Sequence, residues 1–129
     1  MNNLEKHFVN FKQATDLKSI DFDEPCFGRY QIGGDFVLAH TERYVISNGT
    51  DRTKFFILRP LKSQAFEFFR EEHGYDVTIK KITKDKYQFI IELICVEDTS
   101  YHFVDYYFDS YNEAESSCID KLIKIVKNK

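Results

Sequence analysis

The chain has 129 residues, of which 30% are charged and 43% hydrophobic, and its formal net charge is −3. These proportions are typical of a folded globular protein, and the mild negative charge argues against a wide nucleic-acid footprint. No run of residues approaches the ~18 apolar positions of a membrane span. The segment Met1–Lys6 lacks the apolar core of a signal peptide. We therefore expect a cytoplasmic protein without a membrane partner.

Residues 1–59 predict a short helix followed by short strands. Phe11, Ala14 and Leu17 recur at helical spacing, and Pro25 disfavours a helical residue before it. Gly33–Asp35 predicts a hairpin turn. The predicted strands of this half are Cys26–Ile32, Phe36–Ala39, Tyr44–Ile46 and Phe55–Leu58.

Residues 60–129 predict a helix, three strands and a second helix. Pro60 suits the first turn of the first helix, and Gly74 is a C-terminal stop signal. The three strand segments are too closely spaced for crossover helices, so they predict an antiparallel meander. Their apolar alternation runs through Tyr75–Lys80, Tyr87–Cys95 and Tyr101–Phe108.

The last helix has a clear beginning in the sequence. Ser110 and Glu113 have the spacing of a capping box, in which the serine hydroxyl binds the third helical amide and the glutamate reaches back to the cap. Lysines crowd its final turns, where cations complement the helix dipole. Its predicted apolar arc comprises Tyr111, Ala114, Cys118, Leu122, Ile125 and Val126.

These elements predict an α+β fold, an antiparallel sheet with helices packed on one face. There is no Ser/Pro-rich linker, internal repeat or low-complexity tract, so residues 1–129 are expected to form a single domain. Within it, residues 1–59 supply the short helix and strands and residues 60–129 the helix–three strands–helix unit. A fragment from residue 60 onward is expected to lack full native stability.

The sequence contains no catalytic or metal-binding constellation. Its four histidines and three cysteines show no CxxC, HxxxH or HExxH spacing, and a structural zinc site needs four converging ligands. Cys95 and His102 can face each other across a hairpin, but Cys95 lies in an apolar alternation, where a core thiol is the simpler interpretation. We therefore expect no enzyme activity, no cofactor and no metal, and reduced thiols in keeping with the cytoplasm.

The aromatic content is high, with 13 Phe, 8 Tyr and no Trp. The second and third strands carry apolar residues on both faces, so the sheet must be covered twice. Either the elements of the first half cover the second face, or a protein partner or a second copy does. This pattern predicts four partner-binding residues, Tyr101, Phe103, Tyr106 and Tyr107. Replacing Tyr106 or Tyr107 by alanine should weaken binding.

Three segments resemble a group of uncharacterised small proteins carried by phages, prophages and mobile elements of gut-type anaerobic bacteria. They are Leu17–Phe27, Leu61–Tyr75 and Ser110–Ile123. Phe68 stands where the group usually has Trp, which is a conservative departure. The resemblance covers most of the chain and implies an origin rather than a chemistry. It raises the expectation of a small host-directed protein, such as an inhibitor of host defence.

The order helix–three strands–helix also resembles that of the double-stranded-RNA-binding domain, whose second helix opens with a lysine-rich phosphate-binding motif. When the motif's alanine is aligned on Ala114, its lysine positions are taken by Tyr111, Asn112 and Glu115. The resemblance therefore supports the fold but argues against duplex binding through this helix.

From these observations we expect a small cytoplasmic phage or mobile-element protein that binds a host or phage protein. A nucleic-acid-binding module of the same fold is the alternative, and a homodimer formed through the aromatic sheet face is a third interpretation.

Overall fold

The computed structural model describes residues 5–23, 26, 28–31, 36–38, 56–94, 99–103 and 107–128. It has the predicted α+β class, with helices and two antiparallel three-stranded sheets. The chain divides into two compact units, residues 1–64 and 65–129, which are described separately below. The expectation that residues 1–129 form a single domain remains a prediction.

The first unit begins with a 3-10 turn, η1 (Glu5–His7), and the predicted short helix, α1 (Phe11–Ser19). The cap of α1 was not expected: Asn10 and Gln13 form a reciprocal capping box. The backbone N–H of Gln13 donates to Asn10 Oδ1 at 2.8 Å, and the backbone N–H of Asn10 donates to Gln13 Oε1 at 3.0 Å. Gln13 is fully buried, so its carboxamide satisfies a backbone donor at the helix start.

The sheet of this unit has the order β2–β1–β3, with β1 (Gly28–Gln31) in the centre, β2 (Phe36–Leu38) and β3 (Phe56–Arg59). Both pairings are antiparallel. Three of the four predicted strands are therefore present over the residues that the structure describes. The predicted strand Tyr44–Ile46 and the turn Gly33–Asp35 lie outside the described residues.

The end of β3 is held to the start of the chain by a buried arginine. Arg59 Nε donates to the Val9 carbonyl at 2.6 Å, and Nη1 donates to Glu5 Oε1 at 3.0 Å. The guanidinium also lies 5.6 Å from the centroid of the Phe8 ring. Next to it, the Val9 amide donates to the Pro60 carbonyl at 3.1 Å. Pro60 therefore precedes the next helix rather than forming its first turn, which corrects the prediction.

The predicted α2 (Lys62–His73) has most of its length in the second unit, and Gly74 ends it with a φ of 77°. A positive φ of this kind costs glycine little, since it has no Cβ. Ala65, Phe68 and Phe69 are buried, as their helical spacing predicts.

The sheet of the second unit has the order β4–β5–β6, formed by β4 (Tyr75–Thr83), β5 (Lys86–Ile94) and β6 (Thr99–Phe103). Both pairings are antiparallel, which confirms the meander. The register shifts between Lys81 and Thr83, so a β-bulge interrupts β4 beside Ile82.

The described part of the third strand, β6, covers Thr99–Phe103, and residues 104–106 of the predicted strand lie outside the described residues. Phe103 pairs with Ile90, whereas Phe108 forms an isolated bridge with Tyr87. Ile90 and Tyr87 are thus three residues apart on β5, whereas their partners Phe103 and Phe108 are five residues apart. Phe108 nevertheless reaches the core, where its ring stacks on Phe89 with centroids 5.8 Å apart.

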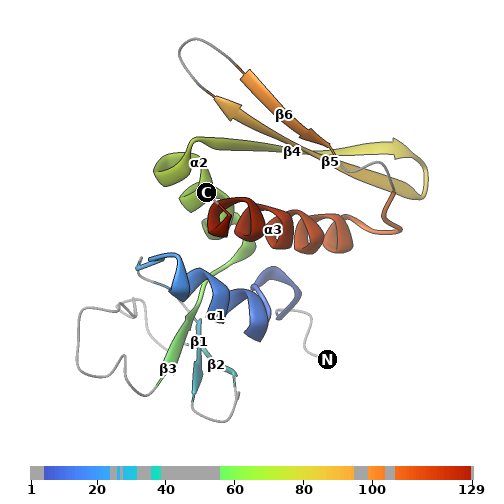
Figure 1. Cartoon of the computed structure of the whole chain (residues 1–129). Helices are drawn as coiled ribbons and strands as arrows, with labels where there is room; N and C mark the ends of the chain where they lie inside the picture. The colour runs from blue at the N-terminus through green and yellow to red at the C-terminus, as the bar shows by residue number, and fades with distance from the viewer. Residues whose placement is uncertain are drawn as a thin grey trace. The chain divides into compact units, whose positions relative to one another are not determined.

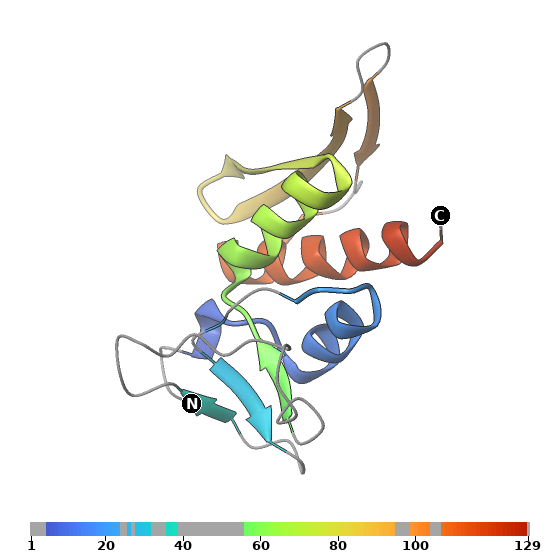
Figure 2. The same ribbon diagram turned by 90° about the vertical axis from the view of Figure 1, so that its left-hand side faces the viewer.

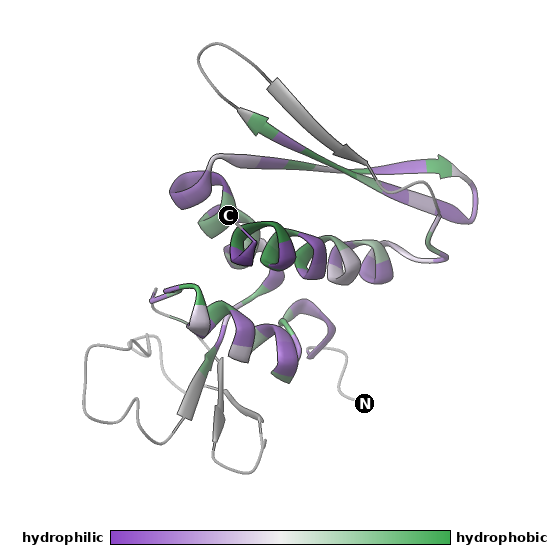
Figure 3. Cartoon of the chain, viewed as in Figure 1, coloured by the Kyte–Doolittle hydropathy of each residue, from purple (hydrophilic) through white to green (hydrophobic). Residues whose placement is uncertain are grey.

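The last helix, α3 (Tyr111–Lys127), begins at Ser110, whose hydroxyl accepts a hydrogen bond from the Glu113 amide at 3.1 Å. The return bond differs from the predicted one, because Glu113 Oε2 accepts from the Asp109 amide. Figure 3 shows α3 alternating between hydrophobic and hydrophilic positions. Its buried residues are Ala114, Cys118, Ile119, Leu122 and Ile123, so the core arc is rotated relative to the predicted one.

Both α2 and α3 lie on the same side of the β4–β5–β6 sheet (Figure 1 and Figure 2). The sheet contributes Tyr75, Phe89 and Ile91 to the core between the layers. The prediction of helices packed on one face is therefore confirmed. In the described part of the chain, no helix is both long and apolar enough to cross a membrane.

Candidate functional site

The predicted aromatic surface is only partly described. The register places Tyr101 opposite Glu92 and Phe103 opposite Ile90, on β6. Tyr107 lies just before the Phe108 bridge and is 55% exposed. Tyr106 lies outside the described residues. Tyr107 is therefore the one predicted contact residue whose exposure the structure gives.

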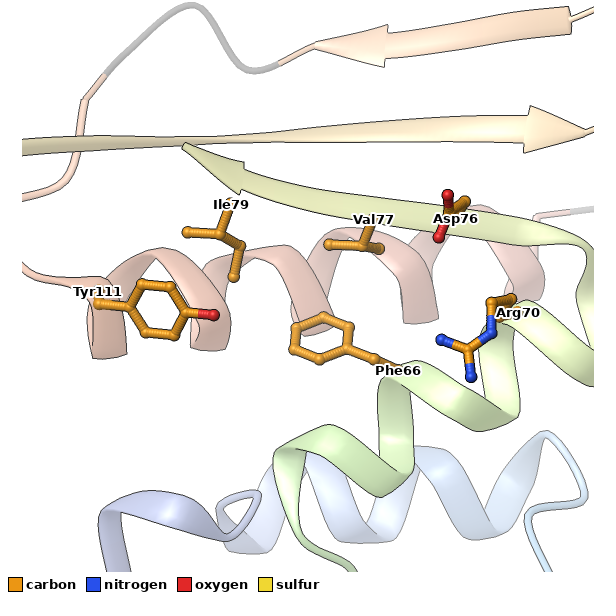
Figure 4. Close-up of a pocket in the computed structure, with 6 residues that line it drawn as sticks. All are labelled: Phe66, Arg70, Asp76, Val77, Ile79 and Tyr111. Carbon is orange, nitrogen blue, oxygen red and sulfur yellow. The ribbon is translucent and has the colours of Figure 1, made fainter. Parts of the chain in front are cut away.

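A groove that sequence reasoning missed lies between α2, α3 and β4 (Figure 4). Val77 and Ile79 point from β4 toward the two helices, and Phe66 lies across from them on α2. The groove has a volume of about 110 Å³. Its lining residues are Phe66, Arg70, Asp76, Val77, Ile79 and Tyr111.

Tyr111 forms one end of the groove and is 50% exposed, although its spacing placed it on the core arc of α3. Its ring packs edge-on against Tyr87, with centroids 6.0 Å apart. Burial, followed by the charge of Glu115, raises the pKa of the Tyr111 phenol. The hydroxyl, which Figure 4 shows pointing along the groove, therefore stays protonated at neutral pH and can donate a hydrogen bond.

Arg70 and Asp76 lie at the other end of the groove. Arg70 Nε donates to Glu71 Oε1 at 3.2 Å, and both side chains are at least half exposed. An exposed pair of this kind contributes little to stability. Arg70 thus keeps terminal guanidinium donors for an acceptor that enters the groove.

The groove borders an open sheet edge, because β4 pairs with β5 alone among the described strands. On β4 the half-buried Val77 and Ile79 alternate with Asp76, Thr78 and Lys80. The bulge beside Ile82 ends the regular stretch, and Ile82 is 37% exposed. A regular open edge is a template for pairing with another strand unless it is protected.

The size and lining of the groove limit its chemistry. Pockets for small molecules usually hold about 300–1,000 Å³, so a groove of about 110 Å³ accommodates roughly one side chain. Among the described residues, no group of three or more His, Cys, Asp or Glu side chains is placed to hold a metal ion. The groove is therefore smaller than the usual pocket for a small molecule.

The signal for the groove was present in the sequence but ambiguous. Phe66 lies off the arc of α2 defined by Ala65, Phe68 and Phe69, which marks it as an aromatic side chain outside the main core. Tyr111 is the first residue of α3, a position that faces the core or solvent depending on how the chain enters the helix. Sequence spacing alone does not distinguish these cases.

Cys118 is predicted to react very slowly with thiol reagents in the native protein. It is fully buried, and this burial, together with Glu115, raises the pKa of its thiol. The nucleophilic thiolate is therefore scarce at neutral pH. In a Cys95→Ser variant, which leaves the buried Cys26 and Cys118, iodoacetamide labelling followed by mass spectrometry should be slow without urea and fast in urea. Rapid, selective native labelling of either thiol would contradict this and support a catalytic cysteine.

The comparisons with known proteins found no relatives. No protein-family model, no curated protein and no solved structure matches the chain.

Proposed function

We propose that this chain is a small cytoplasmic protein of phage or mobile-element origin that acts by binding a host or phage protein, for example by inhibiting a host defence protein. The origin rests on the resemblance of Leu17–Phe27, Leu61–Tyr75 and Ser110–Ile123 described above. The binding role rests on the surface of the second unit. The proposal assigns no enzymatic role to the chain.

The observation that carries the binding role is that most of the exposed large apolar side chains among the described residues, three against Phe11 alone, lie on one unit. Tyr107, Tyr111 and Ile82 are 55%, 50% and 37% exposed, and all three belong to residues 65–129. Tyrosine is favoured as an interface anchor because it combines a large apolar ring with a hydrogen-bonding hydroxyl. The small volume of the groove supports the same interpretation.

The described charges weigh against the nucleic-acid alternative at the last helix. Asp109 and Glu113 flank the cap of α3, where a phosphate-binding helix of the double-stranded-RNA-binding type carries lysines. Like charges would repel the nucleic-acid backbone. A salt-sensitive duplex affinity that is lost when Asn112 or Tyr111 is replaced would favour the alternative instead.

Replacing Tyr107 by alanine is predicted to weaken capture of the protein partner about tenfold, since loss of an aromatic anchor usually costs about 1–2 kcal/mol or more. The measurement is affinity capture from host lysate, with the retained protein identified and its affinity for purified native and variant chains determined. Phe11→Ala is the matched control, because Phe11 is 46% exposed but lies on α1.

An unchanged affinity of the Tyr107→Ala chain would contradict the proposal that Tyr107 contacts the protein partner. Retention of nucleic acid alone would contradict protein binding itself.

A further inference from the structure

We propose that the open edge of β4 pairs with β4 of a second copy of this chain, in antiparallel orientation about a two-fold axis at Thr78. The inference does not depend on the proposed host-directed function. It follows from the sequence of charges along this edge and from the groove beside it.

The edge is self-complementary about Thr78. Reversing the strand about this residue brings Asp76 of one copy opposite Lys80 of the other, and the two-fold axis repeats this pair. Asp76 is half-buried and Lys80 exposed, and neither has an ion-pair partner within the described part of the chain. Opposite charges placed directly across two strands stabilise an antiparallel pair.

The same register matches the apolar residues. Val77 of one copy faces Ile79 of the other, and Thr78 faces its own counterpart. Val77 and Ile79 are both only half-buried and both line the groove. In the paired state, the second copy's branched side chains lie against this groove and remove its apolar lining from water.

Other two-fold registers are poorer. An axis at Lys80 places that lysine opposite its own counterpart, and like charges directly opposite are destabilising. An axis at Val77 or Ile79 leaves Asp76 without Lys80 as its partner. An axis between two residues would place the helical layers of the two copies on opposite faces of the sheet.

The bulge sets the length of the contact. Because the register shifts between Lys81 and Thr83, regular pairing is limited to Tyr75–Lys81. Each copy contributes one β4 edge, so the contact is isologous and closes at two copies rather than extending into a fibre. The lysines that usually protect an open edge are here balanced by Asp76.

Charge reversal tests the pairing with the full-length chain. The native protein should be a dimer by size-exclusion chromatography with light scattering at about 100 µM. Asp76→Lys and Lys80→Asp, each alone, should weaken dimerisation at least tenfold, because each places like charges opposite one another twice. Lys124→Asp makes the same charge change at an exposed position of α3 and should have no effect.

Restoration makes the test specific. The double exchange Asp76→Lys/Lys80→Asp, and an equimolar mixture of the two single variants, should both recover the dimer. A native chain that stays monomeric at 500 µM would overturn the proposal regardless of how the variants fold. A dimer that is insensitive to both reversals, or whose loss is not recovered by the mixture, would overturn it as well.

A covalent test fixes the register independently. In a Cys95→Ser background, Thr78→Cys should give a disulfide-linked dimer with diamide as the oxidant, because equivalent residues on the axis have Cβ atoms within about 5.5 Å. Lys84→Cys, in the turn beyond the bulge, should give no disulfide-linked dimer under the same conditions. Absence of the Thr78→Cys cross-link, or equal cross-linking at both positions, would overturn the assigned axis.

Discussion

Replacing Arg59 by alanine is expected to lower the free energy of unfolding by about 3 kcal/mol. The side chain of Arg59 is only 6% exposed and donates to both the Val9 carbonyl and Glu5. Its removal takes a charged donor from a buried carbonyl, breaks the ion pair and leaves a cavity beside Phe8. The measurement is urea unfolding followed by far-UV circular dichroism.

Two further variants separate the contributions at this site. Glu5→Gln retains an acceptor for Arg59 and removes only the charge of a side chain that is 33% exposed, so it should cost about 1 kcal/mol or less. Arg59→Lys keeps the charge but loses the planar fork, and should lie between the two. If Arg59→Ala unfolds at the same urea concentration as the native chain, the contacts of Arg59 with Val9 and Glu5 contribute nothing to stability.

Replacing Phe89 by alanine is expected to cost about 3–5 kcal/mol, the range for truncating a buried aromatic side chain. Phe89 is 1% exposed on β5 and stacks on Phe108. The substitution therefore removes transfer free energy and leaves a cavity between the sheet and the helices. The same urea titration measures the loss.

Tyr107→Ala provides the contrast, since a side chain that is 55% exposed should change stability by about 0.5 kcal/mol or less. Equal destabilisation by Phe89→Ala and Tyr107→Ala would contradict the placement of Phe89 in the core.

Comparison of Phe89→Ala with Arg59→Ala also addresses domain organisation. If residues 1–129 form a single cooperative domain, Phe89→Ala and Arg59→Ala should shift one common transition, whereas two domains would give separate transitions.

The second half was predictable because each of its boundaries has a local cause. Gly74 ends α2 through a backbone conformation that suits glycine, and Ser110 caps α3 through its own hydroxyl. The alternation of Phe89 and Ile91 likewise fixes the core face of β5. Signals of this kind act over a few residues, so a single sequence contains them in full.

The features that escaped prediction depend on contacts between distant segments. Arg59 donates to Val9 and Glu5, which are more than 45 residues away in the sequence. No local pattern marks Arg59 as buried. The groove requires α2, β4 and α3 together. The core arc of α3 also includes Ile119 and Ile123, which their spacing in the sequence did not indicate.

The unequal lengths of the two segments between β5 and the Phe108 bridge constrain how this chain can change in length. Five residue steps from Phe103 to Phe108 face three steps from Ile90 to Tyr87. The excess of two residues equals one full period of strand alternation, which agrees with the position of Phe108 on the side of the sheet that carries Phe89. Removing one residue there would put Asp109 five steps after Phe103, in the place of Phe108. Removing two would leave three steps between Phe103 and Phe108, as many as separate Ile90 from Tyr87. Viable deletions in this segment are therefore expected to come in pairs.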